Sequence, residues 1–178
     1  MPDGLVSAED LLAGLRRLGA KMARRGLTAD VYVVGGAALV IAYRARPATR
    51  DIDAVFAPDS EVTAAAAEVA RERRWPSTWL NNQASIYLSR LPDHGRRLIL
   101  EAPGIRCMAA SPEHLLAMKV MAARETQDVG DIRFLIEHLG LGSPDDVWRV
   151  VGEVFPGHRV KDRARLLVED LFEQSAGA

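Results

Sequence analysis

The stretch of residues 31–56 limits what this chain can fold into more than any other part of the sequence. Residues 31–34 are apolar and rich in valine, and Gly35 and Gly36 follow them directly. This combination is typical of a buried β-strand that ends in a tight backbone turn. Residues 51–56 predict a second strand, so the glycine turn stands between two strands of one sheet.

Asp51 and Asp53 alternate with apolar residues in the second predicted strand. Alternate side chains of a strand share a face, so the two carboxylates are expected to lie side by side. They repel each other when unpaired, but together they can bind a divalent cation such as Mg²⁺ or Mn²⁺, and Mg²⁺ keeps positions open for substrate phosphates. The backbone amides of Gly35 and Gly36 can approach a phosphate because no side chain covers them. The stretch therefore predicts a cation-dependent phosphate site.

Length and composition are those of a folded protein of moderate size. The 178 residues, 48% of them hydrophobic, suffice for one globular domain with a real core. The single cysteine, Cys107, allows no intramolecular disulfide and favours a reducing compartment. Neither a signal peptide nor an apolar run of the about 20 residues that span a bilayer is visible, so we expect a cytoplasmic protein without membrane contact. The net charge of −1 means that any contact with nucleic acid needs a local basic patch.

The remaining pattern predicts an α/β core followed by helices. Residues 1–110 are expected to form a small mixed sheet flanked by helices, and residues 111–178 a helical region packed on it as one compact unit. Ser7 and Ser111 are predicted N-caps, and residues 93–95 indicate a hairpin turn. Helices are expected at residues 8–25, 37–43, 62–74, 112–124 and 132–139 and in two segments after residue 143, and further strands at residues 85–91 and 98–102.

Lys119 is unusual because it interrupts the apolar face of a predicted helix. Leu115 and Leu116 are among its neighbours at helical spacing. The lysine either extends along this surface to reach water or supplies a point charge to a polyphosphate. Because Asp51 and Asp53 already indicate phosphate chemistry, the second interpretation is favoured. Asp128 and Asp131 precede the next predicted helix, where either of them can also serve as a cap.

These residues resemble a known protein family. Gly35 and Gly36 after a strand, with Thr49-Arg50-Asp51-Ile52-Asp53 on the next one, are similar to the signature of the nucleotidyltransferase fold superfamily. Lys119 and Asp131 make the chain resemble, more specifically, the AbiEii-type and Men-type toxin nucleotidyltransferases of bacterial toxin–antitoxin systems. The resemblance extends from about residue 30 to the C-terminal helices. Many superfamily members have Gly-Ser where this chain has Gly-Gly, so the serine contact to phosphate is absent here, and Gly-Gly is similar to the toxin form.

The resemblance implies a toxin that transfers nucleotides, of the pyrimidine type, from a nucleoside triphosphate to the 3′ end of tRNA. It also implies Mg²⁺ or Mn²⁺ as the cofactor and a cognate antitoxin protein as a second partner besides the tRNA. Asp131 would orient Lys119 or the nucleotide. The residues implied are Asp51, Asp53, Lys119 and Asp131 for catalysis, Gly35, Gly36 and Lys119 for nucleotide binding, and Asp51 and Asp53 for the metal.

Thr49, Glu101 and a set of arginines are further candidate functional residues. Thr49, two residues before Asp51, either fixes the beginning of the strand or is a regulatory position where a phosphate group would block the donor. Glu101 is a candidate third metal ligand, with a structural role as the alternative. A set of arginines near the motif is expected to attract RNA: Arg44, Arg46, Arg50, Arg96 and Arg97.

Two other functions compete with a tRNA nucleotidyltransferase. The first is a nucleotidyltransferase that modifies a small molecule or a protein hydroxyl, for which an acidic acceptor pocket would be typical rather than flanking arginines. The second is a non-catalytic binding module or antitoxin with the same fold. The intact Asp51 and Asp53 argue against the second, because a site without catalysis tends to lose its carboxylates.

Overall fold

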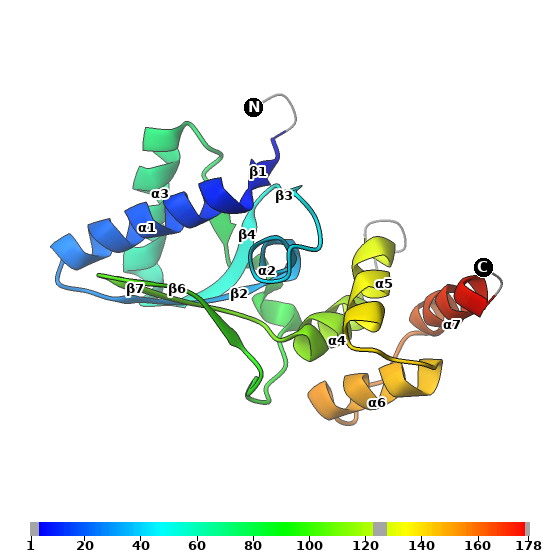
Figure 1. Cartoon of the computed structure of the whole chain (residues 1–178). Coiled ribbons are helices and arrows are strands. Elements are labelled where there is room, and N and C mark those ends of the chain that lie inside the picture. The colour runs from blue at the N-terminus through cyan, green and yellow to red at the C-terminus, as the bar shows by residue number, and fades with distance from the viewer. Residues whose placement is uncertain (1–3, 123–127, 177–178) are drawn as a thin grey trace. The chain divides into compact units, whose positions relative to one another are not determined.

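The computed structural model describes residues 4–122 and 128–176. The chain divides into two compact units whose segments interleave (Figure 1). The first combines the chain up to Ile86 with Arg96–Ala110, and the second combines Tyr87–Gly95 with the chain from Ser111 onward. The sequence placed the boundary after residue 110 and assigned residues 87–95 to the core, whereas these residues group with the second unit.

A five-stranded mixed sheet forms the centre of the first unit, in the order β5-β4-β2-β7-β6. The central strand β2 is antiparallel to β4 and parallel to β7. At the edges, β5 is parallel to β4 and β6 is antiparallel to β7. A separate two-stranded sheet joins β1 to β3. The strands are β1 (Val6–Ser7), β2 (Ala29–Val34), β3 (Ala48–Thr49), β4 (Ile52–Ala57), β5 (Leu80–Asn81), β6 (Arg97–Ala102) and β7 (Ile105–Ala109).

Three helices accompany this sheet: α1 (Ala8–Arg24), α2 (Gly35–Ile41) and α3 (Asp59–Arg73). The predicted cap of α1 is confirmed, because the Ser7 side chain accepts a hydrogen bond from the Asp10 amide. Helices α1 and α3 cross each other above the sheet in Figure 1. The buried stripe of α1, with Leu11, Leu15 and Leu18 fully covered, explains the helical spacing of apolar residues in the sequence.

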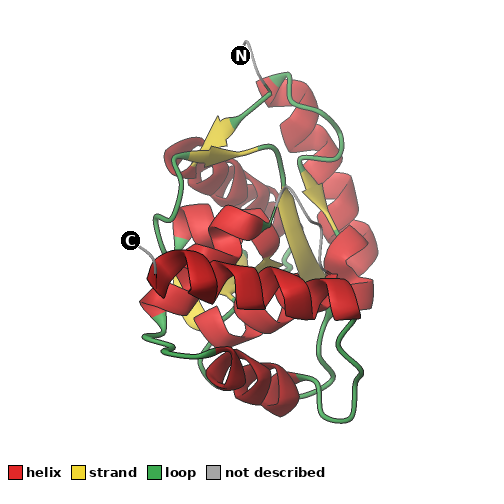
Figure 2. Cartoon of the chain, turned by 90° about the vertical axis from the view of Figure 1, so that its right-hand side faces the viewer, coloured by secondary structure: helices red, strands yellow, loops and turns green. Residues whose placement is uncertain are grey.

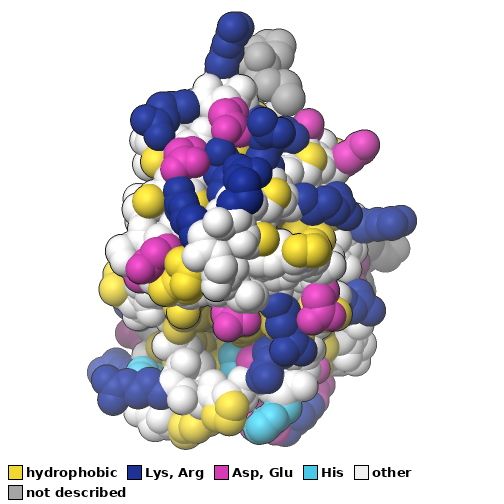
Figure 3. All heavy atoms as spheres, turned by 90° about the vertical axis from the view of Figure 1, so that its left-hand side faces the viewer, with side chains coloured by type: hydrophobic (Ala, Val, Ile, Leu, Met, Phe, Trp, Pro, Cys, Tyr) yellow, Lys and Arg dark blue, Asp and Glu magenta, His cyan; other side chains and the backbone are white. Residues whose placement is uncertain are grey.

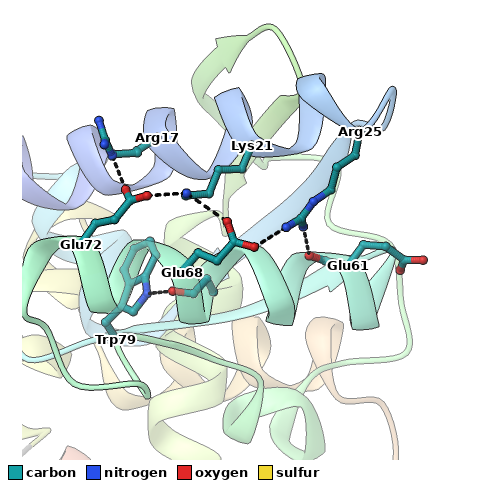
Figure 4. A network of polar contacts seen from close by, with 8 residues as sticks. Arg17, Lys21, Arg25, Glu61, Glu68, Glu72 and Trp79 are labelled. Atoms are coloured by element: carbon teal, nitrogen blue, oxygen red, sulfur yellow. Dashed lines mark hydrogen bonds and ion pairs between the residues drawn. The ribbon is translucent and has the colours of Figure 1, made fainter.

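A network of ion pairs lies between α1 and α3, with the side chains of the two helices pointing toward each other (Figure 4). Lys21 is buried, and its Nζ lies 2.6 Å from Glu72 Oε1 and 3.0 Å from Glu68 Oε2. Glu72 also accepts a hydrogen bond from Arg17. The hydrogen bonds from Arg17 and Lys21 lower the pKa of Glu72 from 4.5 to about 2. Folding therefore favours the ionised form of this glutamate.

Glu72→Gln is expected to lower the melting temperature at neutral pH. The pKa of Glu72 is depressed in the folded protein, so its contribution to stability is present above 4.5 and is lost as the pH falls toward about 2. The difference in melting temperature from wild type should narrow over this range. Glu169→Gln, which removes the same charge from an exposed position of another helix, is the control. A difference that stays constant across this range would contradict the prediction.

The described elements of the second unit are helices, which appear red in Figure 2. Ser111 accepts a hydrogen bond from the His114 amide at 3.2 Å, which confirms it as the cap of the first of them. None of the helices in the described parts of the chain is long and apolar enough to cross a membrane. The four helices are α4 (Pro112–Ala122), α5 (Val129–His138), α6 (Pro144–Val154) and α7 (Asp162–Ala176).

The segment between α3 and β6 differs from the sequence prediction. Residues 85–91 are not a strand: a 3₁₀ helix, Gln83–Tyr87, begins there because the Asn81 side chain accepts the Gln83 amide at 3.0 Å and turns the chain. Residues 93–95 are not a hairpin turn either. The hairpin instead joins β6 to β7 around Gly104, which has a positive φ of 76°. Strand β7 itself was not predicted.

Candidate active site

Asp53 lies directly over the glycine turn in the first unit. Strand β2 ends at Val34, and the antiparallel register places Val34 opposite Asp53 on β4. Gly35 has a positive φ of 60°, and a Cβ atom at this position would lie 3.1 Å from Asp53 Oδ2. Glycine is therefore required here both for the backbone conformation and for the close approach of the carboxylate.

Asp51 immediately precedes β4 and is half-buried. The next residue, Ile52, is fully buried, and its amide donates a hydrogen bond to Trp79 O at 2.7 Å. Asn81 Nδ2 donates to Asp51 Oδ2 at 3.4 Å. Burial raises the pKa of the Asp51 carboxyl above 3.8, and the positive charges of Arg50 and Arg46 oppose this rise.

Gly36 leaves room for an arginine. A Cβ atom on Gly36 would collide with the guanidinium of Arg46, and it would lie 3.0 Å from Thr49 Oγ1. Thr49 is buried with 8% exposure, because β3 pairs with β1 through Thr49 and Val6. The glycine turn, a cationic side chain, a hydroxyl and the two aspartates thus come from one continuous stretch of sequence.

The donor atoms of this arrangement fit a small divalent cation. Asp51 and Asp53 offer carboxylate oxygens, which are the ligands that Mg²⁺ prefers, and Mg²⁺ binds through one or two carboxylates together with substrate phosphates. Within residues 4–122 and 128–176, no third His, Cys, Asp or Glu completes a metal-binding group with them. Glu101 on β6 is in register with Arg106 on β7, and Arg106 is in register with Asp30, at the end of β2 away from Val34. The side chains of Glu101 and Arg106 form an ion pair at 3.8 Å. Glu101 is therefore separated from Asp53 along the length of the sheet.

Lys119 and Asp131 lie together in the second unit. Lys119 Nζ is 2.8 Å from Asp131 Oδ2 and 2.6 Å from Asp128 Oδ1, and all three side chains are buried. Asp128 stands at the beginning of α5 but makes no side-chain capping bond, and instead accepts the lysine. Lys119 therefore does not extend to solvent. Two carboxylates from the start of α5 hold its charge.

The five arginines of the predicted RNA surface occupy different environments. Arg44, Arg50 and Arg96 are exposed. Arg46 is partly buried against Gly36, as described above. Arg97 donates through Nη1 to Ala42 O at 3.1 Å, and its guanidinium lies 5.8 Å from the centre of the Tyr43 ring. On the face drawn in Figure 3, basic side chains are interspersed with acidic ones.

Two residues of these clusters were not assigned from the sequence. The signal for Asn81 is a polar residue directly after the apolar pair Trp79 and Leu80, which is typical of the end of a buried strand. Asp128 was interpreted as a cap. The spacing of Asp128 and Asp131, one turn apart at a helix start, was the signal that both can reach one cation.

A valine-rich strand that ends in Gly-Gly beside an Asp-x-Asp strand, within a mixed sheet covered by helices, defines a nucleotidyltransferase-type domain. Residues 12–140, more than two thirds of the chain, match the model of the family described as nucleotidyltransferase of unknown function (DUF6036). The chain belongs to this family. No curated protein and no solved structure matched it in the two other comparisons.

Alanine substitutions of the two glycines are expected to differ in effect. Gly35→Ala forces a side chain into the left-handed region, so the free energy of unfolding should fall by about 1–2 kcal/mol. Gly36→Ala has to displace the end of the Arg46 side chain and comes within 3.0 Å of Thr49 Oγ1, but it needs no left-handed backbone, so the free energy of unfolding should fall less than in Gly35→Ala while nucleotide transfer falls. Gly152→Ala in α6, where a Cβ would meet nothing within 4 Å, is the control. Chemical denaturation measures the free energy of unfolding of all three variants. Equal losses of this free energy in Gly35→Ala and Gly152→Ala would contradict the requirement for glycine at position 35.

Proposed function

We propose that this protein is a toxin-type nucleotidyltransferase that adds nucleotides, preferentially pyrimidines, to the 3′ end of tRNA and so blocks translation. The observation that carries the proposal is the Asp51–Asp53 pair beside the Gly35–Gly36 turn, in a chain of a nucleotidyltransferase family. The cytoplasm, where tRNA and nucleoside triphosphates occur, is the proposed location. A cognate antitoxin protein is the proposed inhibitor.

In the proposed mechanism, Asp51 and Asp53 hold Mg²⁺ or Mn²⁺. The cation, when bound, supplies positive charge that neutralises the triphosphate and activates the α-phosphorus. The terminal hydroxyl oxygen of the acceptor forms a bond to the α-phosphorus. The bond between the α-phosphorus and the oxygen that bridges to the β-phosphate breaks, and pyrophosphate leaves. Asp53 accepts the hydroxyl proton. The amides of Gly35 and Gly36 contact the phosphates.

The buried ion cluster of α4 and α5 has a separate role in this proposal. Lys119 supplies positive charge for the triphosphate, and Asp131 orients Lys119, for which the 2.8 Å contact between the two gives support. Because Asp128 makes the shorter contact, at 2.6 Å, it shares the orienting role. Two contacts restrict the ammonium group more than one, so the charge is held in a defined position.

RNA is the acceptor that the local charge favours. Arg50 is exposed next to Asp51, and Arg46 and Arg50 both act on its charge. Arg44 is also exposed and precedes the motif in the chain. A cluster of cations beside a catalytic centre attracts a polyanion and repels a cationic small molecule such as an aminoglycoside.

Thr49 is proposed as the regulatory position of the site. A phosphate on its hydroxyl would add about −1.5 to −2 charge between Arg46 and the glycine turn. It would compete there with the phosphates of the donor. Because Thr49 is buried in the β1–β3 pair, modification requires this pair to open first. Intact-mass measurement after co-expression with the antitoxin tests this idea, and an unshifted mass in a silenced toxin would rule it out.

The acceptor is tested with tRNA whose 3′ end is either intact or oxidised by periodate. Intact tRNA should become labelled from an α-labelled nucleoside triphosphate, and more from CTP or UTP than from ATP or GTP. Oxidised tRNA, which lacks the terminal diol, should not. Binding of the tRNA should weaken steeply between about 50 and 200 mM salt because phosphate contacts release counterions. Label that appears only on protein or on a small molecule would contradict the choice of acceptor.

A further inference from the structure

Asn81 lies beside the aspartate pair, on the short edge strand β5. The parallel register pairs Asn81 with Asp53 and Leu80 with Ile52. Paired residues of neighbouring strands direct their side chains to the same face of a sheet. Asn81 and Asp53 therefore share a face, and Asn81 also contacts Asp51. A single neutral side chain thus stands next to both carboxylates.

The orientation of the Asn81 amide is fixed by the turn that follows. The Gln83 amide donates to Asn81 Oδ1 at 3.0 Å. A backbone N–H can only donate, so the oxygen of the side chain must face it and the nitrogen must face the other way. That nitrogen donates to Asp51 Oδ2 at 3.4 Å and to Thr78 O at 3.3 Å.

Asp51 depends on such a contact because it precedes the regular part of β4. Its neighbour Ile52 is anchored through the backbone to Trp79, so the main chain of Asp51 is held on one side. The carboxylate itself is half-exposed. A donor of neutral charge can restrain it without adding to the repulsion between Asp51 and Asp53 or competing for the cation.

We propose that Asn81 is a positioning residue of the cation site, which holds the Asp51 carboxylate in the orientation that binds the metal. The proposal rests on the proposed function, because it assigns Asp51 and Asp53 to the cation. Residues that hydrogen-bond to metal ligands without touching the metal commonly change metal affinity by about 10- to 100-fold when they are replaced. Asn81 has the contacts of such a residue, with one end fixed by the backbone and the other on a ligand.

The test is Mn²⁺ binding to the nucleotide-free protein, measured by calorimetry. Asn81→Ala should bind Mn²⁺ about 10- to 100-fold more weakly than wild type. Asn82→Ala, which changes an exposed neighbour in the same turn, should bind like wild type. Melting temperatures without metal show whether each variant is folded, which separates loss of the metal contact from loss of the turn.

Asn81→Asp provides a second variant that keeps the turn, because its carboxylate still accepts the Gln83 amide. It replaces the donor to Asp51 by a third negative charge, so Mn²⁺ should raise its melting temperature more than it raises that of wild type. Wild-type Mn²⁺ affinity in Asn81→Ala would overturn the role of Asn81 but not the cation site. The same holds if Mn²⁺ raises the melting temperatures of Asn81→Asp and wild type equally. Absence of Mn²⁺ binding in the wild type would overturn the proposed cation site together with the role of Asn81.

Discussion

Replacement of Asp51 or Asp53 by asparagine is expected to reduce nucleotide transfer to below about one thousandth of the wild-type rate, which corresponds to about 4 kcal/mol of lost transition-state stabilisation. Asparagine keeps the size of the side chain but removes the negative charge that the cation needs. The two variants should also lose Mn²⁺ binding. Rates at saturating donor measure the effect, because they separate turnover from weakened nucleotide affinity.

Asp51→Asn should be more stable than wild type at neutral pH in metal-free buffer. Burial raises the pKa of Asp51 above 3.8, so the ionised carboxylate costs stability in the folded protein. This cost diminishes as the pH falls through the raised pKa and disappears below 3.8, where the carboxyl is protonated in both the folded and the unfolded state. The gain from asparagine should therefore vanish at low pH.

Asp30→Asn is the matched control for these variants. Asp30 lies on β2 at the end of the sheet opposite Asp53, in register with Ala57 and Arg106, and it is exposed. The same chemical change at this position should leave both transfer and Mn²⁺ binding intact. Wild-type transfer by Asp51→Asn or Asp53→Asn would overturn the assignment of the aspartate pair.

Lys119→Met is expected to affect both stability and turnover. Lys119 is buried between Asp128 and Asp131, so its replacement leaves two buried carboxylates without their cation. Removal of one member of a buried ion pair typically costs about 3–5 kcal/mol. Nucleotide affinity and turnover of the remaining folded protein should each fall by more than about tenfold, equivalent to roughly 1.4 kcal/mol.

The two effects are separated by neutralising the aspartates as well. Lys119→Met combined with Asp128→Asn and Asp131→Asn removes the unpaired charges, so much of the lost stability should return. Turnover should remain low, because the proposed charge for the triphosphate is still absent. A combined variant that regains both stability and turnover would show that the cluster is purely structural. Denaturation curves and donor-dependent kinetics decide between the two outcomes.

The elements that the sequence predicted best depend on short-range patterns. The valine-rich strand before Gly35, the cap at Ser7 and the placement of Asp53 on the next strand each follow from residues a few positions apart. The mixed sheet and the helical C-terminal part follow the same reasoning. Family membership came from the comparison over residues 12–140, and it extends to nucleotidyltransferases but not to the toxin type.

What the sequence did not predict depends on contacts between distant segments. Strand β7 alternates buried and exposed residues, but it is short and becomes recognisable only through its pairing with β2 and β6. Asn81 reaches Asp51 because β5 pairs with β4, although the whole of α3 separates the two strands in the sequence. Asp128 shares Lys119 with Asp131 because α5 begins beside α4, which no local propensity encodes.

Nucleotide transfer is distinguished from other phosphate chemistry by the position of the label in the donor. Purified protein is incubated with Mg²⁺, total RNA and a nucleoside triphosphate that carries radioactive phosphorus at either the α- or the γ-position. We expect the α-label to become covalently attached to RNA of tRNA size, while the γ-label is released as pyrophosphate and attaches to nothing. Attachment of the γ-label, or an α-label that joins no RNA, protein or small molecule, would contradict nucleotide transfer.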